Sequence, residues 1–326
     1  MNRRTVLSLG ALGLASLAQR LLGQSPRRVY RIGLLSSSGE ASMVGFVQAL
    51  WAGLREHGYV DGQNIILDPR YAAGEADRLP LLARELVAAK PDLIVAPAEG
   101  AAVEVRKLDK NLSIVLVLGS DPVGAGLARS LGRPGGSVTG LSAIGTELTA
   151  KRLELLAEAL PGRKRVAVLY RGRVMAAESQ LEALRALANA KALQLIPVEV
   201  GSEEALPAAI DTTSRSADAL LVLPSPFAFT HRKRIVDLVR EKGVPAMYGE
   251  SVFVTEGGLM AYSVDFHHQF RRAAGYVHRI LKGAKPGDMP IEEPTKFELA
   301  VNLRTAREMQ LKLPPALLVR ADRVIE

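Results

Sequence analysis

Polar side chains that suit ligand binding stand in short turns directly after apolar runs of the sequence. Serines, carboxylates and tyrosines in these turns offer hydrogen-bond donors, acceptors and negative charge. In an open sheet of parallel strands, the turns at the carboxyl ends of the strands form the crevice that holds ligands. We therefore expect a ligand-binding site made by ten residues: Ser36, Ser37, Glu99, Ser120, Asp121, Tyr170, Ser225, Tyr248, Glu250 and Tyr262.

Each of these residues also has an ordinary structural explanation. A serine in front of a helix caps it, and Asp121-Pro122 is a good helix start in any protein. A tyrosine at a sheet edge packs against its neighbours as readily as against a ligand. The sequence leaves both interpretations open.

Signals of catalysis are absent from the sequence. It holds no cysteine, which excludes thiolate chemistry, and it lacks the G-x-G-x-x-G, phosphate-loop and G-x-S-x-G motifs. None of the histidines has the spacing of a zinc site: His57, His231, His267, His268 and His278. We therefore expect no enzymatic activity, no cofactor and no metal.

From residue 29 onward, apolar runs typical of buried parallel strands alternate with segments of helical spacing. The first series predicts strands at 29–35, 64–71, 92–96, 113–118 and 137–141, with helices at 43–56, 79–90 and briefly after Asp121-Pro122. The second predicts helices at 147–159, 178–190, 203–214 and 233–242, and strands at 165–169, 193–200, 219–223 and 244–248. This repetition predicts two Rossmann-like, doubly wound α/β lobes with parallel sheets.

Several helix ends carry capping signals. His57-Gly58 is expected to end the helix at 43–56, because glycine accepts the left-handed backbone that follows many helices. Asp77 is expected to cap the helix at 79–90, and Asn302 the helix at 305–311. The helices that follow 36–38 and 99–100 are expected to present free backbone N–H groups to a ligand.

The last seventy or so residues form too few elements for a third domain. They predict strands at 258–264 and 296–301 and helices at 266–281 and 305–311. We expect them to complete the two lobes, which assigns 29–142 plus 265–297 to an N-terminal lobe and 143–264 plus 298–326 to a C-terminal lobe. A chain that crosses more than once between rigid lobes makes a hinge.

The N-terminus has the pattern of an export signal, which we assign to residues 1–23. Arg3-Arg4 precedes an apolar run from 6 to 18, shorter than the about 20 residues that span a bilayer, and Ser16-Leu17-Ala18 offers a cleavage site. The arginine pair fits the twin-arginine pathway loosely, so that pathway and the general secretion pathway both stay open. A short cytosolic helix and a retained anchor are the two alternatives.

Charge and cysteine content narrow the partners. The net charge is +8, but the basic residues are scattered among acidic ones and do not form a stripe interleaved with aromatics. We therefore expect no nucleic-acid binding. Without a cysteine the chain cannot be a lipoprotein, so we expect a periplasmic protein with no stable membrane insertion after cleavage.

Blocks of sequence in a fixed order extend over nearly all of residues 30–326. The most specific are SDPVGAGL at 120–127 and RPGGSVTG at 133–140. Further blocks lie at 57–64, 78–80, 86–88, 90–92, 164–170, 221–224, 257–260, 281–286 and 294–299. Together they resemble the ABC-transporter substrate-binding family typified by tryptophan- and tyrosine-binding proteins.

This resemblance implies the architecture of a type I periplasmic binding protein: two Rossmann-like lobes, a three-segment hinge and a solute in the cleft. It implies a monomer that captures a small organic solute (an amino acid, an aromatic or a carboxylate-bearing compound). The solute would pass unchanged to an ABC permease and its ATPase. Carried over to this chain, the contacts are Ser37, Asp121, Tyr170, Ser225 and Tyr248.

The chain departs from the family pattern at two turns. Ala98-Glu99-Gly100 stands where relatives usually have Gly-Thr-Pro, and Pro224-Ser225-Pro226 where they have Leu-Pro-Asp-Pro. The first change adds a carboxylate and the second removes one, and a Glu99 that faces the cleft would favour a ligand with an amino group. Two other functions stay open from the sequence: a ligand-sensing domain for a membrane kinase, and a two-lobe Rossmann-like enzyme.

Overall fold

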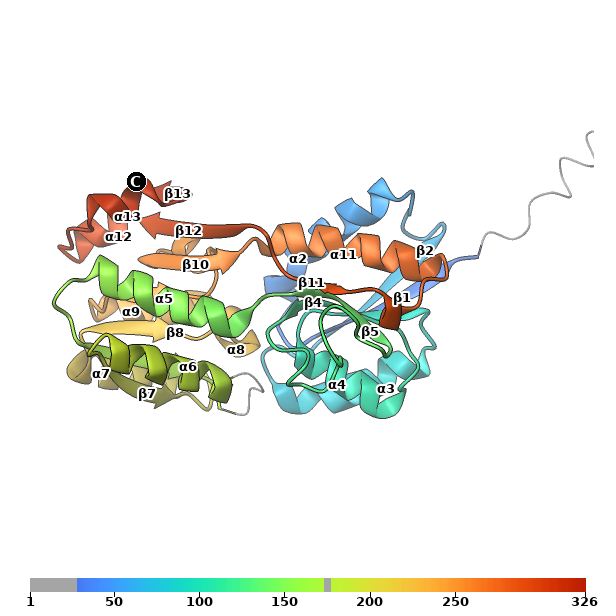
Figure 1. The fold of residues 1–326 in the computed structure, drawn as a ribbon, viewed down its shortest axis with the longest axis horizontal. Coiled ribbons are helices and arrows are strands. Elements are labelled where there is room, and N and C mark those ends of the chain that lie inside the picture. The colour runs from blue at the N-terminus through green and yellow to red at the C-terminus, as the bar shows by residue number, and fades with distance from the viewer. Residues whose placement is uncertain (1–27, 173–176) are drawn as a thin grey trace, which may run out of the picture.

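Two lobes lie side by side in the computed structural model, which describes residues 28–172 and 177–326 (Figure 1). Each lobe has a central sheet with helices on both faces, as the predicted Rossmann-like architecture requires. The predicted signal segment at 1–23 lies outside the described residues. Within the described ranges, no helix is both long and apolar enough to cross a membrane.

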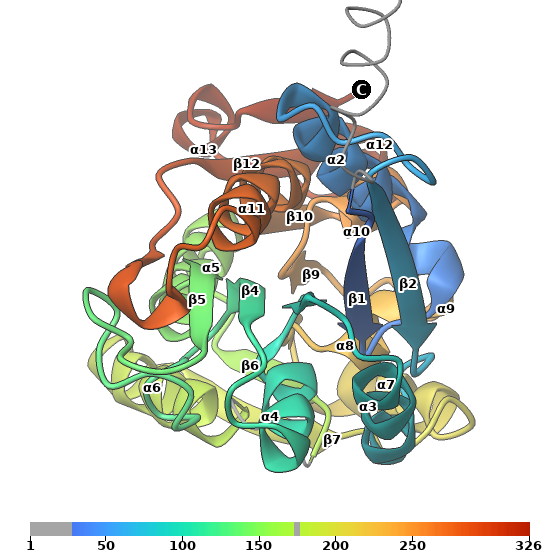
Figure 2. The same cartoon turned by 90° about the vertical axis from the view of Figure 1, so that its right-hand side faces the viewer.

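The first lobe contains β1 (Tyr30–Ser36), α2 (Glu40–Glu56), β2 (Ile65–Tyr71), η1 (Ala76–Arg78), α3 (Leu79–Ala88), β3 (Leu93–Ala96), α4 (Glu99–Leu108), β4 (Ile114–Gly119), β5 (Val138–Ser142), α11 (Phe266–Leu281), η2 (Pro286–Asp288) and β11 (Ile291–Glu292). Its six strands are all parallel, in the order β11-β5-β4-β3-β1-β2. Helices α2 and α11 cover one face of the sheet, and α3 and α4 cover the other (Figure 2).

The second lobe contains α5 (Gly145–Ala159), β6 (Arg165–Tyr170), α6 (Ala177–Ala190), β7 (Gln194–Glu199), α7 (Leu206–Ser216), β8 (Ala219–Val222), α8 (Pro226–Thr230), α9 (Arg232–Glu241), β9 (Ala246–Tyr248), α10 (Val252–Thr255), β10 (Met260–Val264), β12 (Phe297–Asn302), α12 (Leu303–Glu308), α13 (Pro315–Val319) and β13 (Arg323–Ile325). Its seven strands run in the order β13-β12-β10-β9-β8-β6-β7. Only β12 is antiparallel to a neighbour, β10. The order β7-β6-β8-β9-β10 repeats β2-β1-β3-β4-β5 of the first lobe.

Three segments connect the lobes: 143–144 between β5 and α5, Asp265 between β10 and α11, and 293–296 between β11 and β12. At the last of these, Phe297 already pairs with Val264 in the second sheet. The carboxyl ends of the parallel strands in each lobe therefore point toward the region between the lobes, where the connections lie (Figure 1).

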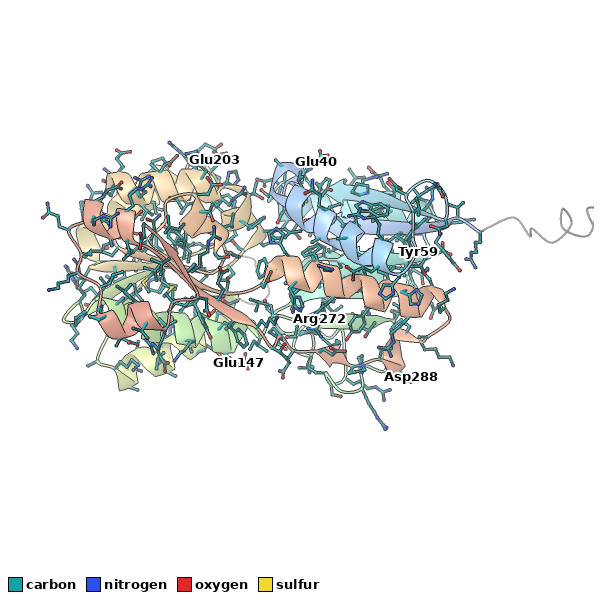
Figure 3. The ribbon with its side chains drawn as sticks, turned by 90° about the horizontal axis from the view of Figure 1, so that it is seen from above. Glu40, Tyr59, Glu147, Glu203, Arg272 and Asp288 are labelled. Atoms are coloured by element: carbon teal, nitrogen blue, oxygen red, sulfur yellow. The ribbon has the colours of Figure 1, made fainter. Side chains whose placement is uncertain are left out.

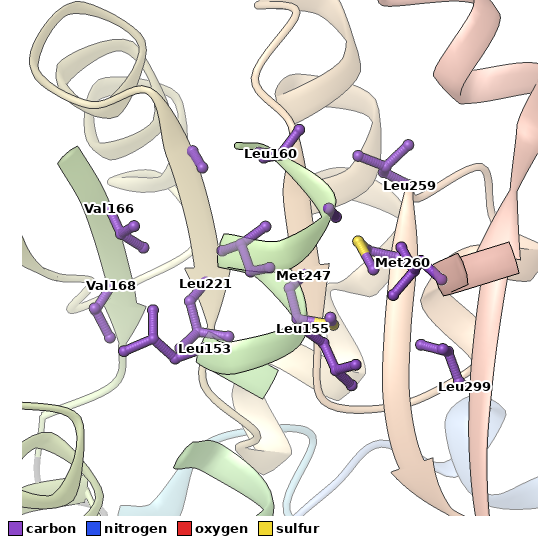
Figure 4. Packing of buried hydrophobic residues seen from close by; sticks show 14 of the residues in the cluster. Leu153, Leu155, Leu160, Val166, Val168, Leu221, Met247, Leu259, Met260 and Leu299 are labelled. Carbon is purple, nitrogen blue, oxygen red and sulfur yellow. The ribbon is translucent and has the colours of Figure 1, made fainter. Parts of the chain in front are cut away.

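Apolar residues on both faces of each sheet form the cores. In the second lobe, Leu153 and Leu155 of α5 pack with Leu221 of β8 and Met247 of β9, and none of the four is more than 3% exposed (Figure 4). Full burial of one such side chain contributes about 1.5–3 kcal/mol. The inner strands β3, β4 and β8 are buried along nearly their whole length, which explains why they read as continuous apolar runs in the sequence.

Two of the predicted helix ends are confirmed. His57 ends α2 and is followed by Gly58 with φ +80°, a backbone that glycine adopts without steric cost. The Asn302 side chain accepts a hydrogen bond from the Thr305 N–H at 3.1 Å and so caps α12.

Two expectations for the first lobe are wrong. Asp77 does not cap α3: it lies inside the 3-10 turn η1, and the cap residue Arg78 has helical backbone angles and no side-chain cap bond. No helix follows Asp121-Pro122. The Asp121 carboxylate instead accepts from the Gly124 N–H at 2.8 Å, and the chain leaves the turn at Gly126 with φ +67°. A side chain that binds the local backbone competes with helix formation.

Charged side chains of both signs cover the outer surface of the two lobes. Glu40, Glu147, Glu203 and Asp288 are exposed examples (Figure 3). Ion pairs such as Arg320–Glu158 at 2.6 Å join neighbouring elements on this surface, and pairs of this exposed kind are each worth about 0–1 kcal/mol.

Candidate functional site

A cavity of about 340 Å³ lies between the two lobes. Both lobes line it with residues at the carboxyl ends of strands and in the helices that follow. In the first lobe, Ser37 follows β1, Glu99 follows β3 and Ser120 follows β4, while Ser225 and Glu250 follow β8 and β9 in the second. This is the position in which open α/β sheets hold ligands, and the volume suits a small organic molecule.

Direct contacts join the lobes at the rim of this cavity. The Gly39 N–H donates to Thr230 Oγ1 at 3.2 Å, and Arg232 Nη1 donates to Ser42 Oγ at 2.9 Å. The ring of Phe46 in α2 lies 5.5 Å from that of Phe229 in α8. With these contacts made, the lobes are in a closed arrangement around the cavity.

Glu99 is a buried carboxylate of the first lobe, 8% exposed, at the first position of α4. Its Oε1 accepts a hydrogen bond from the Asp121 N–H at 2.7 Å. Burial raises the pKa of Glu99, whereas the backbone N–H groups of Asp121, of Glu99 itself and of Ser120 act in the opposite direction. The turn after β4 and the start of α4 thus hold this carboxylate in a cradle of N–H groups.

Glu250 is the matching buried carboxylate of the second lobe, 7% exposed, in the turn between β9 and α10. Among the described residues, its side chain has no hydrogen-bond partner and no ion pair within 4.0 Å. Burial raises the pKa of Glu250 to about 7, and the charges of Arg152 and Arg232 only partly offset this effect.

Arg152 of α5 supplies a buried positive charge to the cavity and is 3% exposed. It donates to the Tyr262 carbonyl at 2.7 Å, to the Gly249 carbonyl at 3.1 Å and to Thr149 Oγ1 at 3.3 Å. Burial lowers its pKa to about 10, so it stays protonated at neutral pH. The bond to Gly249 fixes the turn that carries Glu250.

Arg152 is not among the site residues expected from the sequence, although a signal for it was present. Arg152 lies four residues after Leu148 and four before Leu156, both of which are buried. Residues four apart share one face of a helix, so this arginine stands on the apolar face of α5. A charged residue in that position is rarely buried without a partner, and it marks a polar site in the interior.

Phenylalanine rings form the apolar walls of the cavity. Phe46 is 5.2 Å from Phe270 and 5.9 Å from Phe266, measured between ring centroids, and Phe227 and Phe229 of α8 lie opposite, in the second lobe. The Arg171 guanidinium stands over the Phe227 ring at 4.6 Å from its centroid. Tyrosine walls were expected from the sequence, and these phenylalanines were not.

Five of the ten expected site residues line the cavity: Ser37, Glu99, Ser120, Ser225 and Glu250. One of them also has the structural role that the sequence left open. Ser225 Oγ accepts from the Ala228 N–H at 3.0 Å and caps α8.

The other five lie outside the cavity lining, each for a physical reason. Ser36 Oγ accepts from the Ser38 N–H at 3.1 Å, and Asp121 is used in its own turn. Tyr248 is fully buried and stacks on Phe253, and burial raises its pKa. Tyr170 packs on the core of the second lobe, and Tyr262 does so too while its ring stacks on Phe297.

In the described part of the chain, no group of three or more His, Cys, Asp or Glu side chains could hold a metal ion. The described residues that line the cavity offer three carboxylates, two arginines, several hydroxyls and a set of aromatic rings. These groups can hold a small molecule with an apolar body and an ionic end.

Comparisons with known proteins agree with this description. The chain is 25% identical over 268 residues to the Tyrosine-binding protein of Clostridioides difficile (strain R20291), covering 82% of this chain and 76% of that protein. A Streptococcus pneumoniae ABC domain in complex with L-Trp superimposes with a TM-score of 0.84 at 26% identity, covering 91% of this chain and 100% of the other. A conserved domain protein of Vibrio cholerae has the same coverage, a TM-score of 0.86 and 24% identity.

The sequence model of one family matches residues 31–325, almost the whole described chain. The two parallel-sheet lobes with three connections are those of the type I periplasmic binding proteins. The chain belongs to the ABC transporter substrate binding protein family.

Proposed function

We propose that this protein captures a small organic solute between its lobes and delivers it, chemically unchanged, to the permease and ATPase of an ABC importer. One observation carries the proposal: in a member of this family, the closed lobes enclose a cavity lined by buried charges and aromatic rings. Both lobes contribute charge, with Glu99 from the first and Glu250 and Arg152 from the second. A solute that touches both sets stabilises the closed state by its additional contacts there.

Opening and closing would take place at the three connections. We take 29–142 plus 265–296 and 143–264 plus 297–326 as the two rigid bodies, with Phe297 in the second because it pairs there with Val264. Ile144 in the first connection has φ +39°, a left-handed backbone that a β-branched residue rarely adopts. Its N–H donates to Ser142 Oγ at 3.1 Å, which ties the connection to the end of β5. A strained residue between lobes is a natural place for backbone angles to change.

The family places the protein outside the cytoplasm, and we propose the periplasm, reached through the export signal at 1–23. A monomer is sufficient for this role, because one chain supplies both halves of the cavity. The permease would recognise the closed pair of lobes, which differs from the open pair at the rim contacts Gly39–Thr230 and Ser42–Arg232.

The phenylalanine walls of the cavity and the ligands of two relatives both favour a solute with an aromatic or similarly flat body. Five phenylalanines line the cavity, and burial of an aromatic body against such rings is strongly favourable. A relative with L-Trp bound and another named for tyrosine point in the same direction. Ser36, Asp121, Tyr170, Tyr248 and Tyr262, which lie outside the lining, would support the site and not touch the solute.

Two measurements test this proposal. Native mass spectrometry of the purified protein identifies any solute that it retains, and isothermal titration with aromatic amino acids and amines measures affinity. We expect micromolar or tighter binding and no product. Ala98→Trp, which fills the cavity, should abolish binding, whereas the exposed Ala208→Trp on α7 should leave it unchanged. Equal binding by both variants, or conversion of the solute, would contradict the proposal.

A further inference from the structure

The N–H cradle at the first-lobe wall of the cavity is already occupied by the protein. The Asp121 N–H donates to Glu99 Oε1 at 2.7 Å, and the Ser120 and Glu99 N–H groups also face this carboxylate. Backbone N–H groups at the start of a helix ordinarily attract an anion. Here a side-chain carboxyl group takes that place, so a ligand carboxylate would have to compete with Glu99 for the same N–H groups.

The second-lobe wall presents a carboxylate that has no partner among the described residues. Glu250 is 7% exposed, and no described residue gives it a hydrogen bond or an ion pair within 4.0 Å, although it lines the cavity. A buried carboxylate without a partner is costly, and a cation in the cavity would relieve that cost.

The arginines of the cavity are engaged by the protein. Arg152 directs three of its donors to the Tyr262 and Gly249 carbonyls and to Thr149. Arg171 donates to the Gly201 carbonyl, lies over the Phe227 ring and approaches Glu75 to 4.0 Å. Both arginines therefore already hold protein acceptors.

The charges of the cavity lining also favour a cationic ligand. Among the described residues, the ionisable ones of the lining are the acidic Asp77, Glu99 and Glu250 and the basic Arg152 and Arg171. With all of these ionised, they carry three negative charges against two positive, an excess that a cationic ligand would balance.

We propose that the cavity selects an organic cation, an amine without a carboxylate on an aromatic or similar apolar body. Glu99 and Glu250 neutralise the ammonium group, and the body lies against the phenylalanine rings. Aromatic faces also attract cations, so the walls do not oppose the charge. This inference rests on the proposed function and specifies its ligand class.

Matched ligand pairs test the inference: tryptamine against L-tryptophan, and phenethylamine against L-phenylalanine, titrated into the whole protein at pH 8. Each pair differs only by the carboxylate. We expect the amine to bind at least about 10-fold more tightly than the matching amino acid. This is the size of the effect of one unfavourable buried charge contact.

Variants at the two glutamates locate the effect. Glu99→Gln and Glu250→Gln should each weaken amine binding about 10- to 100-fold, the loss of one charge-assisted contact. Glu99→Ala empties the cradle and should narrow or reverse the preference in favour of the amino acid. The matched controls Glu104→Gln, on the same helix α4, and Glu241→Gln, on α9, lie outside the cavity lining and should behave like wild type.

The outcomes separate this inference from the proposed function. If wild type binds the amino acid of each pair as well as or better than the amine, the inference is overturned and solute capture stands. A carboxylate-bearing solute that co-purifies with the protein would also overturn the inference and leave solute capture standing. If no amine or amino acid binds and nothing co-purifies, the proposed function fails and the inference falls with it.

Discussion

Glu99 and Glu250 are the same residue type, buried to the same degree, on opposite walls of one cavity. Burial raises the pKa of both. The N–H groups around Glu99 favour its ionised form, whereas Glu250 has only the more distant charges of Arg152 and Arg232. The comparison shows that burial alone does not set the state of a carboxylate. The second wall holds a carboxylate that titrates near neutral pH, whereas the first holds one whose N–H cradle counteracts part of the effect of burial.

The largest effect is expected when the charge opposite Glu250 is removed. Arg152→Met leaves the Tyr262 and Gly249 carbonyls without their donor and removes the positive charge that acts most strongly on Glu250. Removal of one partner of a buried charged network costs about 3–5 kcal/mol. Urea unfolding at pH 7.5 measures this, and Arg152→Met combined with Glu250→Gln should recover part of the loss. A loss below about 1 kcal/mol would contradict the role of Arg152.

Glu250 should make stability depend on pH. Its pKa in the folded protein is about 7, against 4.5 in the unfolded chain, so the folded state binds the proton more tightly. The free energy of unfolding should therefore fall by up to about 3 kcal/mol as the pH rises from about 4.5 to 7. Glu250→Gln should remove this part of the pH dependence.

The check is the difference between the two unfolding curves, measured at several pH values in one buffer series. The surrounding charges are Arg152 and Arg232, together with Glu256, which lies 3.4 Å from Arg232. They are unchanged in the variant. Parallel curves for wild type and Glu250→Gln would show that Glu250 titrates near its ordinary pKa.

Amine affinity should follow the same titration. A cation prefers the ionised form of Glu250, so below pH 7 binding must first release a proton. Affinity for tryptamine should fall by up to about 10-fold for each pH unit below 7, about 1.4 kcal/mol, and level off above it. In Glu250→Gln the affinity should be weaker and independent of pH over this range, as titration calorimetry at pH 6, 7 and 8 would show.

The smallest effect is expected at the rim. Thr230→Val keeps the shape of the side chain but leaves the Gly39 N–H without its acceptor in the closed state. One such hydrogen bond is worth about 0.5–1.5 kcal/mol, so solute affinity should fall about 2- to 10-fold. Thr230→Ser retains the hydroxyl and is the matched control. Wild-type affinity in Thr230→Val would show that this contact does not favour closure.

Most of the fold could be predicted from the sequence, because buried parallel strands and amphipathic helices leave clear periodic patterns. Helix α11 was expected with its observed bounds. The short elements α8 and α10 were not expected, since four or five residues carry no periodicity. The turn at Asp121 was misjudged because a local side-chain bond outweighed a good helix start.

The site was less predictable than the fold. Glu99 and Glu250 were found because they follow strand ends. Arg152 was missed because it lies within a helix, where only its place on the apolar face distinguishes it. Tyr248 was expected at the cavity, but the strand that carries it turns its ring into the core, against Phe253. Which face a strand-end side chain takes depends on register, which the sequence does not state.

The most direct test of capture between the lobes is hydrogen exchange, with and without saturating tryptamine or L-tryptophan, whichever binds more tightly. The account predicts slower amide exchange on both walls together: at Gly39 and Asp121 of the first lobe, and at Ala228 and residues 249–253 of the second. Protection confined to one lobe, or none at saturation, would contradict closure of the two lobes around the solute.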